Sequence, residues 1–230
     1  MATVDFLRRV SIFAQLEQQQ LQFLLKKFRG HRYHRNEVVF HQGDPAGRMH
    51  IIIEGRIRIS IASEDGRETD IALLQSGDCF GEMALLDDSN RSATATALVP
   101  SESIALLRQD FLDFLNENPR VVSEVNNMLV ERLRSSNQML GDMVFLDVPT
   151  RVAKHLLRLA EDSDDDEVIL VPIGQDELAH LVGASRETVS RALNGYRRMG
   201  ILSTSHRRIM INDLPRLKHM ASPDSWHKTT

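Results

Sequence analysis

Residues 175–199 read QDELAHLVGASRETVSRALNGYRRM, two short segments of helical periodicity on either side of a glycine. Ala179 is small, as the crossing of two helices requires, and Gly183 supplies the permissive backbone that a tight turn needs. Val189 and Ala192 lie on the inner face of the second helix. The remaining core positions are Leu178, Val182 and Leu193. This spacing predicts a helix-turn-helix.

The outer face of the second helix is polar at its amino-terminal end. Ser185 is placed to cap this helix, and Thr188 is placed to face a phosphate beside the helix start. The long polar side chains of this face are Arg186, Glu187, Ser190 and Arg191. Arginine can grip guanine O6 and N7 with two hydrogen bonds, and glutamate can accept from cytosine N4. We therefore expect base readout in a DNA major groove; a helical hairpin with a solvated charged face is the alternative.

The charge distribution favours the DNA interpretation, although the whole chain is acidic. The 230 residues carry a formal net charge of −4 and have a pI of about 6.1. Binding needs only a local basic face, and residues 183–218 hold eight Arg or Lys against two Asp or Glu. Residues 201–203 and 208–211 show the alternation of side chains that is typical of strands, and a basic turn lies between them. This pattern predicts a β-hairpin wing. The expected phosphate contacts of this wing are Arg207 and Arg208.

Upstream, residues 37–96 show a period near two, which is typical of β-strands. The short apolar runs are Val38 to Phe40, Met49 to Ile53, Ile57 to Ile61 and Ile71 to Leu74. Glycines recur between them about every 11 or 12 residues, which is the spacing of a small antiparallel barrel or jelly roll. Residues 10–29 carry apolar side chains at helical spacing, so a short helical segment is expected before the barrel.

Residues 108–144 are predicted to form one long helix. Its seam steps by three or four residues through Val122, Val125, Leu129, Leu133, Ser136, Leu140 and Met143. So narrow a seam beside a closed barrel indicates pairing with the same helix of a second chain, and we expect a homodimer. Packing of this helix on its own barrel is the alternative.

A second domain is expected after Pro149, where residues 150–159 have the pattern of another amphipathic helix. The acidic run that follows, EDSDDDE at residues 161–167, lacks the glycine and the spaced terminal glutamate of a calcium-binding loop. We interpret it as a solvated connection.

A further motif lies in the first domain, where residues 80–86 read FGEMALL and residues 91–94 read RSAT. A glycine lets the backbone approach a ligand, and the amides at a helix start can hold a phosphate. Arg91 can neutralise that phosphate, and Glu82 can accept from a ribose hydroxyl. These residues predict a nucleotide-phosphate pocket. A buried ion pair between Glu82 and Arg91 is the alternative.

The order of barrel, FGEMALL with RSATA, long helix ending in FLD at residues 145–147, and SRETVSR resembles the Crp/Fnr family of bacterial regulators, above all its cyclic-AMP-responsive members. The resemblance implies an α+β fold. It implies an N-terminal β-roll (jelly-roll) cyclic-nucleotide-binding domain over residues 1–109, a dimerisation helix over 110–147 and a C-terminal winged helix-turn-helix DNA-binding domain over 148–230. The implied effector is cyclic AMP, acting allosterically. The implied effector-binding residues are Gly81, Glu82, Met83, Ala84, Arg91, Ser92, Ser136 and Asn137.

The same resemblance implies a sequence-specific transcription regulator, chiefly an activator, that is not an enzyme. Its implied partners are double-stranded DNA with palindromic sites, a second copy of the chain and RNA polymerase. The implied DNA-binding residues are Ser185, Arg186, Glu187, Thr188, Ser190, Arg191, Arg207 and Arg208.

Four positions depart from the family pattern. Ser136 keeps a hydroxyl where the family has threonine, but Asn137 replaces a serine and changes the donor geometry offered to the base. Gly174 and Gln175 stand where a threonine and an arginine lie near the DNA backbone, so one phosphate contact is expected to be lost. Cys79 is interpreted as a small core residue before the cassette, since the cysteine set of the oxygen-sensing branch is absent.

The composition excludes several classes of protein. A single cysteine forms no internal disulfide and holds no iron–sulfur cluster, which favours a reducing cytoplasm. The first residues lack the apolar stretch of a secretory signal, and no run reaches the ~20 apolar residues of a membrane span. No membrane partner is therefore expected.

Two other functions compete with the regulator that senses cyclic AMP. One is a metal-dependent β-barrel enzyme, because four histidines lie in or near the β region: His31, His34, His41 and His50. No His-X-His pair followed by a carboxylate supports it, and no metal is expected. The other keeps the DNA function but assigns a different small-molecule effector, such as haem or another nucleotide, or none.

Overall fold

The computed structural model describes residues 3–64, 66, 68–161, 169–171, 173–205 and 208–222. The chain forms two compact units, Met1–Arg134 and Ser135–Thr230, and the division falls inside one long helix. None of the helices in these described ranges is both long and apolar enough to cross a lipid bilayer.

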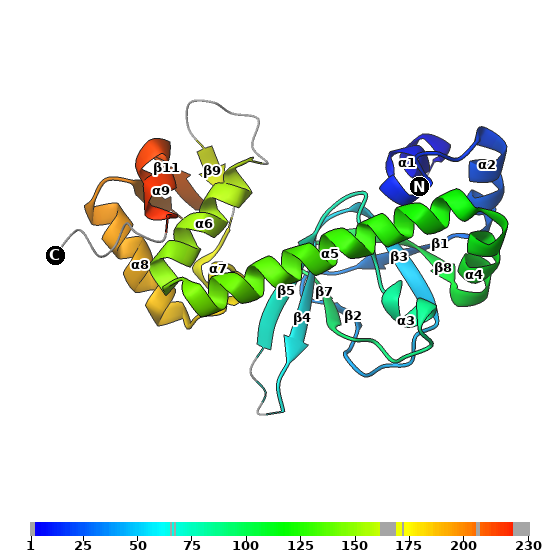
Figure 1. Ribbon diagram of the computed structural model, residues 1–230, viewed down its shortest axis with the longest axis horizontal. Helices are drawn as coiled ribbons and strands as arrows, with labels where there is room; N and C mark the ends of the chain where they lie inside the picture. The colour runs from blue at the N-terminus through cyan, green and yellow to red at the C-terminus, as the bar shows by residue number, and fades with distance from the viewer. Residues whose placement is uncertain are drawn as a thin grey trace. The chain divides into compact units, whose positions relative to one another are not determined.

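The first unit is built on two antiparallel four-stranded sheets (Figure 1). Its strands are β1 (Arg29–Tyr33), β2 (Val38–Phe40), β3 (Arg48–Glu54), β4 (Ile57–Ala62), β5 (Glu68–Leu74), β6 (Cys79–Phe80), β7 (Thr94–Ala97) and β8 (Ser101–Leu107). One sheet has the order β1-β8-β3-β6 and the other the order β2-β7-β4-β5. The four strands predicted from apolar runs are confirmed as β2, β3, β4 and β5. The sequence did not predict β1, β6, β7 and β8, because the apolar alternation in these segments is too short or too polar.

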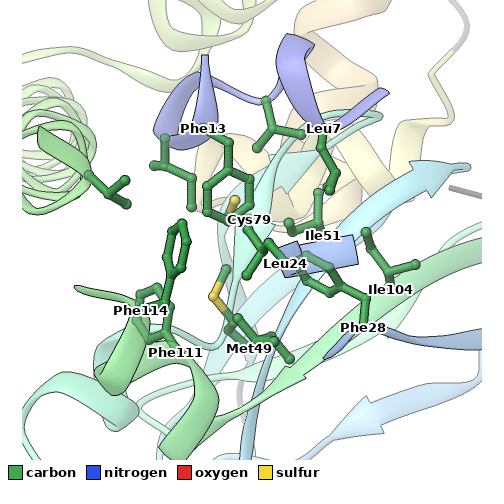
Figure 2. Close-up of a cluster of buried hydrophobic side chains, with 14 of the residues drawn as sticks. Leu7, Phe13, Leu24, Phe28, Met49, Ile51, Cys79, Ile104, Phe111 and Phe114 are labelled. Carbon is green, nitrogen blue, oxygen red and sulfur yellow. The ribbon is translucent and has the colours of Figure 1, made fainter. Parts of the chain in front are cut away.

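Short helices of the first unit complete the core. They are α1 (Val4–Arg9), the 3-10 helix η1 (Ser11–Phe13), α2 (Gln18–Lys27), α3 (Met83–Leu86) and α4 (Arg108–Glu117). Figure 2 shows Leu7 and Phe13 from the amino-terminal helices packed with Met49 and Ile51 of β3 and with Phe111 of α4. Cys79 is buried in this same cluster, which confirms its interpretation as a core residue. Burial of so much apolar surface fixes the sheet beneath the helices.

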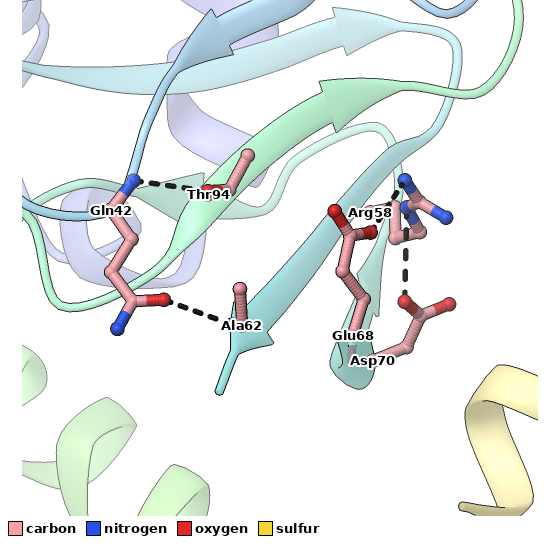
Figure 3. A network of polar contacts seen from close by, with 6 residues as sticks. All are labelled: Gln42, Arg58, Ala62, Glu68, Asp70 and Thr94. Atoms are coloured by element: carbon pink, nitrogen blue, oxygen red, sulfur yellow. Dashed lines mark hydrogen bonds and ion pairs between the residues drawn. The ribbon is translucent and has the colours of Figure 1, made fainter. Parts of the chain in front are cut away.

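A polar network on the other sheet ties its strands together (Figure 3). Arg58 of β4 lies 3.7 Å from carboxylate oxygens of both Glu68 and Asp70 of β5. The backbone amide of Gln42 donates to Thr94 Oγ1 at 3.0 Å, and the Gln42 side chain accepts from the Ala62 amide. Asp70 is only 2 % exposed, and the arginine beside it helps to offset the cost of burying its charge.

The single helix predicted over residues 108–144 is wrong in one respect, because the structure has two helices there. The first, α4, ends at Glu117, and α5 (Pro119–Phe145) begins after Asn118. Asn118 has φ −130° and ψ 77°, outside the helical region. A residue before proline is disfavoured in the α conformation, and proline is well suited to a first helical turn. Pro119 therefore separates a helix that covers the barrel from the long one.

The two sides of α5 differ in burial. Val121 and Val125 are buried in the core of the first unit, and Leu129 packs partly against it, so Val125 does not belong to an exposed seam. Large apolar side chains also lie exposed along the helix: Val122, Val130, Leu133, Leu140, Val144 and Phe145. The predicted stripe is thus present, shifted away from the positions that the barrel covers.

In its described residues, the second unit holds a three-stranded antiparallel sheet and four further helices. Its elements are α6 (Val148–Glu161), β9 (Ile169–Val171), α7 (Gln175–Val182), α8 (Arg186–Arg198), β10 (Leu202–Ser205), β11 (Arg208–Ile211) and α9 (Leu214–Met220). The pairing of β10 with β11 confirms the predicted wing, and β9 adds a strand that the sequence did not reveal. Tyr196 of α8 is fully buried, and its hydroxyl donates to the Pro149 carbonyl at 2.9 Å.

Gly183 makes the turn between α7 and α8. Its φ of 61° and ψ of 48° are left-handed, and its amide donates back to the end of α7. A Cβ at this position would lie 2.5 Å from Cε of Met143. The glycine predicted for the turn is thus required by the left-handed backbone conformation, while the Met143 side chain would have to move aside for a Cβ.

Gly183→Ala should lower the free energy of unfolding by about 1 to 3 kcal/mol, because alanine strains a left-handed residue and also meets Met143. Gly195→Ala is the matched control inside α8. A Cβ there meets nothing within 4 Å, and removing a glycine from a helix stabilises by about 0.5 to 1 kcal/mol. Urea unfolding of the full chain measures both. Equal effects of the two substitutions would contradict the role assigned to Gly183.

Candidate functional site

The FGEMALL and RSAT segments form one corner of the first unit. Gly81 follows β6 with φ 75°, and the one-turn helix α3 begins two residues later. The chain then runs through an exposed loop back to Arg91, just before β7. A Cβ on Gly81 would lie 2.5 Å from Nη1 of Arg91, so glycine allows the arginine to lie directly against the backbone.

Arg91 is a buried cation whose hydrogen bonds go to uncharged groups. Its side chain is 5 % exposed, and Nη1 and Nη2 donate to the carbonyl oxygens of Gly81 and Arg48, each at 2.6 Å. Its guanidinium carbon lies 4.1 Å from the centre of the Phe40 ring. Nε is buried and has no hydrogen-bond partner among the described residues. Burial lowers the pKa of Arg91 from its ordinary value, and this effect outweighs the opposing attraction of the Glu82 and Asp44 carboxylates.

Glu82 is paired with an arginine that the sequence interpretation missed. The Glu82 side chain is 1 % exposed, and its Oε1 accepts from Nη1 of Arg132 on α5, whose Nη2 donates to the Cys79 carbonyl. The alternative of a Glu82–Arg91 ion pair is therefore wrong. Glu82 Oε2 is buried without a hydrogen-bond partner in the described part of the chain. Arg132 lies four residues before Ser136, so the two side chains share one face of the helix. This spacing was the one signal in the sequence that placed Arg132 near the cassette.

The other predicted effector residues differ in exposure. Ala84 is buried, whereas Met83 and Ser92 are exposed at the rim of the cassette. Ser136 and Asn137 are exposed on α5, about one helical turn beyond Arg132. The structure thus brings Gly81, Glu82 and Arg91 into one buried corner.

The histidines of the β region do not form a metal site. Among the residues that the structure describes, no three histidine, cysteine, aspartate or glutamate side chains gather as metal ligands. His50 is buried and stacked on Phe80, with ring centres 5.0 Å apart, and its Nδ1 lies 3.3 Å from Ser103 Oγ. Burial, helped by the nearby Arg91, lowers the pKa of His50 to about 3. His50 is therefore a neutral core residue.

The outer face of α8, which carries the predicted base-reading residues, is held by hydrogen bonds in the first turn of the helix. Ser185 Oγ accepts from the Thr188 amide at 3.2 Å, which confirms the predicted cap of α8. Thr188 Oγ1 lies 2.9 Å from Ser185 Oγ and accepts from Nη2 of Arg191 at 3.2 Å. Thr188 thus links the cap to an arginine of the outer face.

The predicted base-reading side chains lie on one side of α8. Arg186, Glu187 and Arg191 are exposed and Ser190 is half-buried, while Val189 and Ala192 are buried beneath them. Arg208 is exposed at the start of β11. Arg207 lies outside the described residues. The helix therefore offers its polar side chains to solvent while its apolar side holds it to α7.

Comparisons with known proteins agree with both halves of this description. Residues 30–118 match the cyclic nucleotide-binding domain, and residues 150–220 match the Crp-like helix-turn-helix domain. Together the two domains define a DNA-binding transcription regulator that carries a cyclic nucleotide-binding domain. The chain belongs to the Crp/Fnr family of transcription regulators, whose members are regulators and not enzymes.

Relatives match along most of the chain. The CRP-like cAMP-activated global transcriptional regulator of Mycobacterium tuberculosis is 33% identical over 221 residues, which cover 94% of this chain and 99% of that protein. The cyclic AMP receptor protein of Thermus thermophilus is 32% identical over 210 residues, covering 91% and 96%. The solved structure of the c-di-GMP-responsive regulator CLP of Xanthomonas campestris has a TM-score of 0.77, covering 85% of this chain and 99% of that one. At 24% identity, that likeness concerns the fold alone.

His50 predicts how stability depends on pH. The unfolded chain protonates a histidine near pH 6.5, whereas buried His50 stays neutral down to a pKa of about 3. Acidification from pH 7 to pH 5 therefore favours the unfolded chain, and this residue should lower the free energy of unfolding by about 1 to 2 kcal/mol. His50→Phe should remove that share of the loss. Urea unfolding at both pH values measures it, and an unchanged pH dependence in His50→Phe would contradict the assignment.

Proposed function

We propose that this chain is a cyclic-AMP-responsive activator of transcription that binds palindromic DNA as a homodimer in the cytoplasm, with RNA polymerase as a partner. Two buried polar atoms of the cassette carry the sensory half of the proposal. Arg91 Nε and Glu82 Oε2 have no hydrogen-bond partner among the described residues, although both are removed from solvent. Leaving such atoms unpaired is costly, so a ligand that pairs with them gains affinity.

The chemistry of the two groups fits a cyclic nucleotide. A guanidinium without a carboxylate partner favours an anion, and a carboxylate oxygen without a donor favours a hydroxyl. A ribose 3′,5′-cyclic phosphate presents one anionic phosphate beside one free hydroxyl. In this proposal Arg91, Gly81, Ala84 and Ser92 hold the phosphate side and Glu82 holds the ribose.

Arg132 supports this arrangement without being a ligand contact in the proposal. Its guanidinium donates to Glu82 Oε1 and to the Cys79 carbonyl, which fixes the orientation of the Glu82 carboxylate. Ser136 and Asn137, about one turn further along α5, are proposed to face the base. The two relatives with about a third identical residues are both named for cyclic AMP, which favours adenine.

The second unit supports sequence-specific DNA binding. Arg186, Glu187 and Arg191 are exposed at the amino-terminal part of α8, the part of a recognition helix that enters the major groove. With these side chains we expect half-sites that resemble GTG and CAC. The proposed phosphate contacts are Ser185, Thr188, Ser190, Arg207 and Arg208.

The exposed apolar side of α5 supports a homodimer. Leu133 and Leu140 are 60% and 61% exposed in the single chain, on a helix of 27 residues. Their spacing of seven residues is that of a two-stranded coiled coil, in which a second copy of the same helix covers the stripe. A two-fold dimer places two recognition helices on a two-fold DNA site.

Arg91→Leu should weaken cyclic AMP binding about 100-fold or more, since a buried charge-assisted pair with the phosphate is lost. Arg35→Leu, which removes an exposed arginine of the same unit, is the control and should bind as the wild type does. Titration calorimetry with cyclic AMP and cyclic GMP measures both. The factor by which cyclic AMP strengthens DNA binding must equal the factor by which DNA strengthens cyclic AMP binding. A wild type that binds its palindrome but no cyclic AMP would refute the sensory half.

Leu133→Glu and Leu140→Glu should each dissociate the dimer, because a buried unpaired carboxylate costs more than the apolar contacts it replaces. Both side chains are exposed in the single chain, so each unit should still fold. Ser135→Glu is the control, because a residue two positions along does not share a face with Leu133. Sedimentation velocity distinguishes monomer from dimer. Dimers that persist in both leucine variants would place the interface elsewhere.

A further inference from the structure

Arg186, the first residue of the recognition helix, is held by a carboxylate from the preceding helix. Its Nε lies 3.1 Å from Oδ1 of Asp176, the second residue of α7. The two side chains are 70% and 68% exposed, so neither is fixed by burial. The ion pair between them is therefore the contact that can bias the direction of the arginine.

The backbones that carry the two residues are rigidly joined. Leu178 of α7 and Val189 of α8 are both fully buried in the core of the second unit. Gly183 sets the turn between the helices, and Ser185 caps α8 one residue before Arg186. Asp176 and Arg186 thus meet at the open ends of two helices whose relative placement is fixed by packing.

Which nitrogen of Arg186 pairs with Asp176 matters for base reading. Asp176 engages Nε of Arg186, so the two terminal nitrogens remain available as parallel donors. Guanine presents O6 and N7 as two acceptors in the major groove, which such a pair of donors matches. By contrast, Arg191 uses a terminal nitrogen on the neutral Thr188 hydroxyl of its own helix.

The same carboxylate is unfavourable for general attraction to DNA. Asp176 and Glu177 lie at the amino-terminal end of α7, beside a hollow of about 430 Å³ that Arg208 also lines. A negative charge at this end of the helix repels phosphate on every DNA sequence. These two effects of Asp176 can be measured separately. The orientation of Arg186 changes binding only at the base that Arg186 meets, whereas repulsion of phosphate changes binding to every sequence.

We propose that Asp176 is a positioning residue that sharpens the base preference of Arg186 while lowering affinity for DNA in general. The proposal rests on the DNA-reading function proposed above. An exposed ion pair contributes modestly, so we expect Asp176→Asn to reduce the preference for guanine at the Arg186 position about two- to fivefold. Overall affinity should rise, because a repulsive charge has been removed.

Selection from a random duplex library, with and without cyclic AMP, tests this with the full-length chain. The wild type, Asp176→Asn, Asp176→Glu, Glu177→Gln and Arg186→Ala are compared by the base frequencies of the enriched sites. Arg186→Ala should lose about tenfold or more of the preference at one base pair, and so identify the position that Arg186 reads. Asp176→Asn should weaken the preference at that same position, and Asp176→Glu, which keeps the carboxylate, should retain most of it.

Glu177→Gln is the matched control, since it removes the same charge one residue along α7. It should raise affinity as Asp176→Asn does but leave every base preference unchanged. In the Arg186→Ala background, Asp176→Asn should have no further effect on base preference.

The outcomes separate the two proposals. If the wild type enriches a palindrome but Asp176→Asn strengthens all sequences equally, Asp176 acts only as a repulsive charge and the positioning role is refuted. A loss of preference at positions other than the one that Arg186 reads refutes it as well. If the wild type enriches no sequence, the DNA-reading function itself is overturned, and the positioning role with it.

Discussion

The guanidinium of Arg91 is buried against Phe40, donates to two backbone carbonyls and forms no direct ion pair with a carboxylate among the described residues. The first unit keeps this charge because Gly81 leaves room for it and because the surrounding sheets exclude water. A buried cation lowers the stability of the folded unit when it is unpaired, and an anion that pairs with it restores that stability. In the function proposed above, an anionic ligand that reaches Arg91 stabilises the barrel, which is the physical basis of its sensory role.

The long helix α5 connects that pocket with the rest of the chain. Arg132 holds Glu82 of the cassette, and the division between the two units falls just after it, at Arg134. Beyond that point α5 packs within the second unit, where Lys154 pairs with Asp142 at 2.6 Å and Arg151 donates to the Met143 carbonyl. In the function proposed above, a ligand that pairs with Glu82 acts on a helix whose carboxy-terminal part packs within the DNA-binding unit. Coupling along this helix requires that two arrangements of it differ in affinity for the ligand.

The recognition face combines rigid placement with exposed charge. Buried Val189 and Tyr196 fix α8 from below, and the cap at Ser185 fixes its first turn. Asp176 and Thr188 then restrict the two arginines, which would otherwise sample many rotamers in solvent. Holding long side chains near the orientation that they need lowers the entropy lost on binding. In the DNA-reading function proposed above, specific recognition depends on these small polar contacts as well as on the helix itself.

The helix-turn-helix, the wing, four strands and the nucleotide cassette were all predictable from the sequence, because periodicity, caps and glycines act over a few residues. Arg132 as the partner of Glu82 and Asp176 as the partner of Arg186 were not, since each pair joins segments whose approach depends on packing. The break at Pro119 was visible as a proline, but only the structure placed α4 against the barrel core and buried Val125. Local sequence thus determined which elements form and what chemistry they carry. The tertiary structure decided which charges meet, because buried and paired charges depend on every segment packed around them.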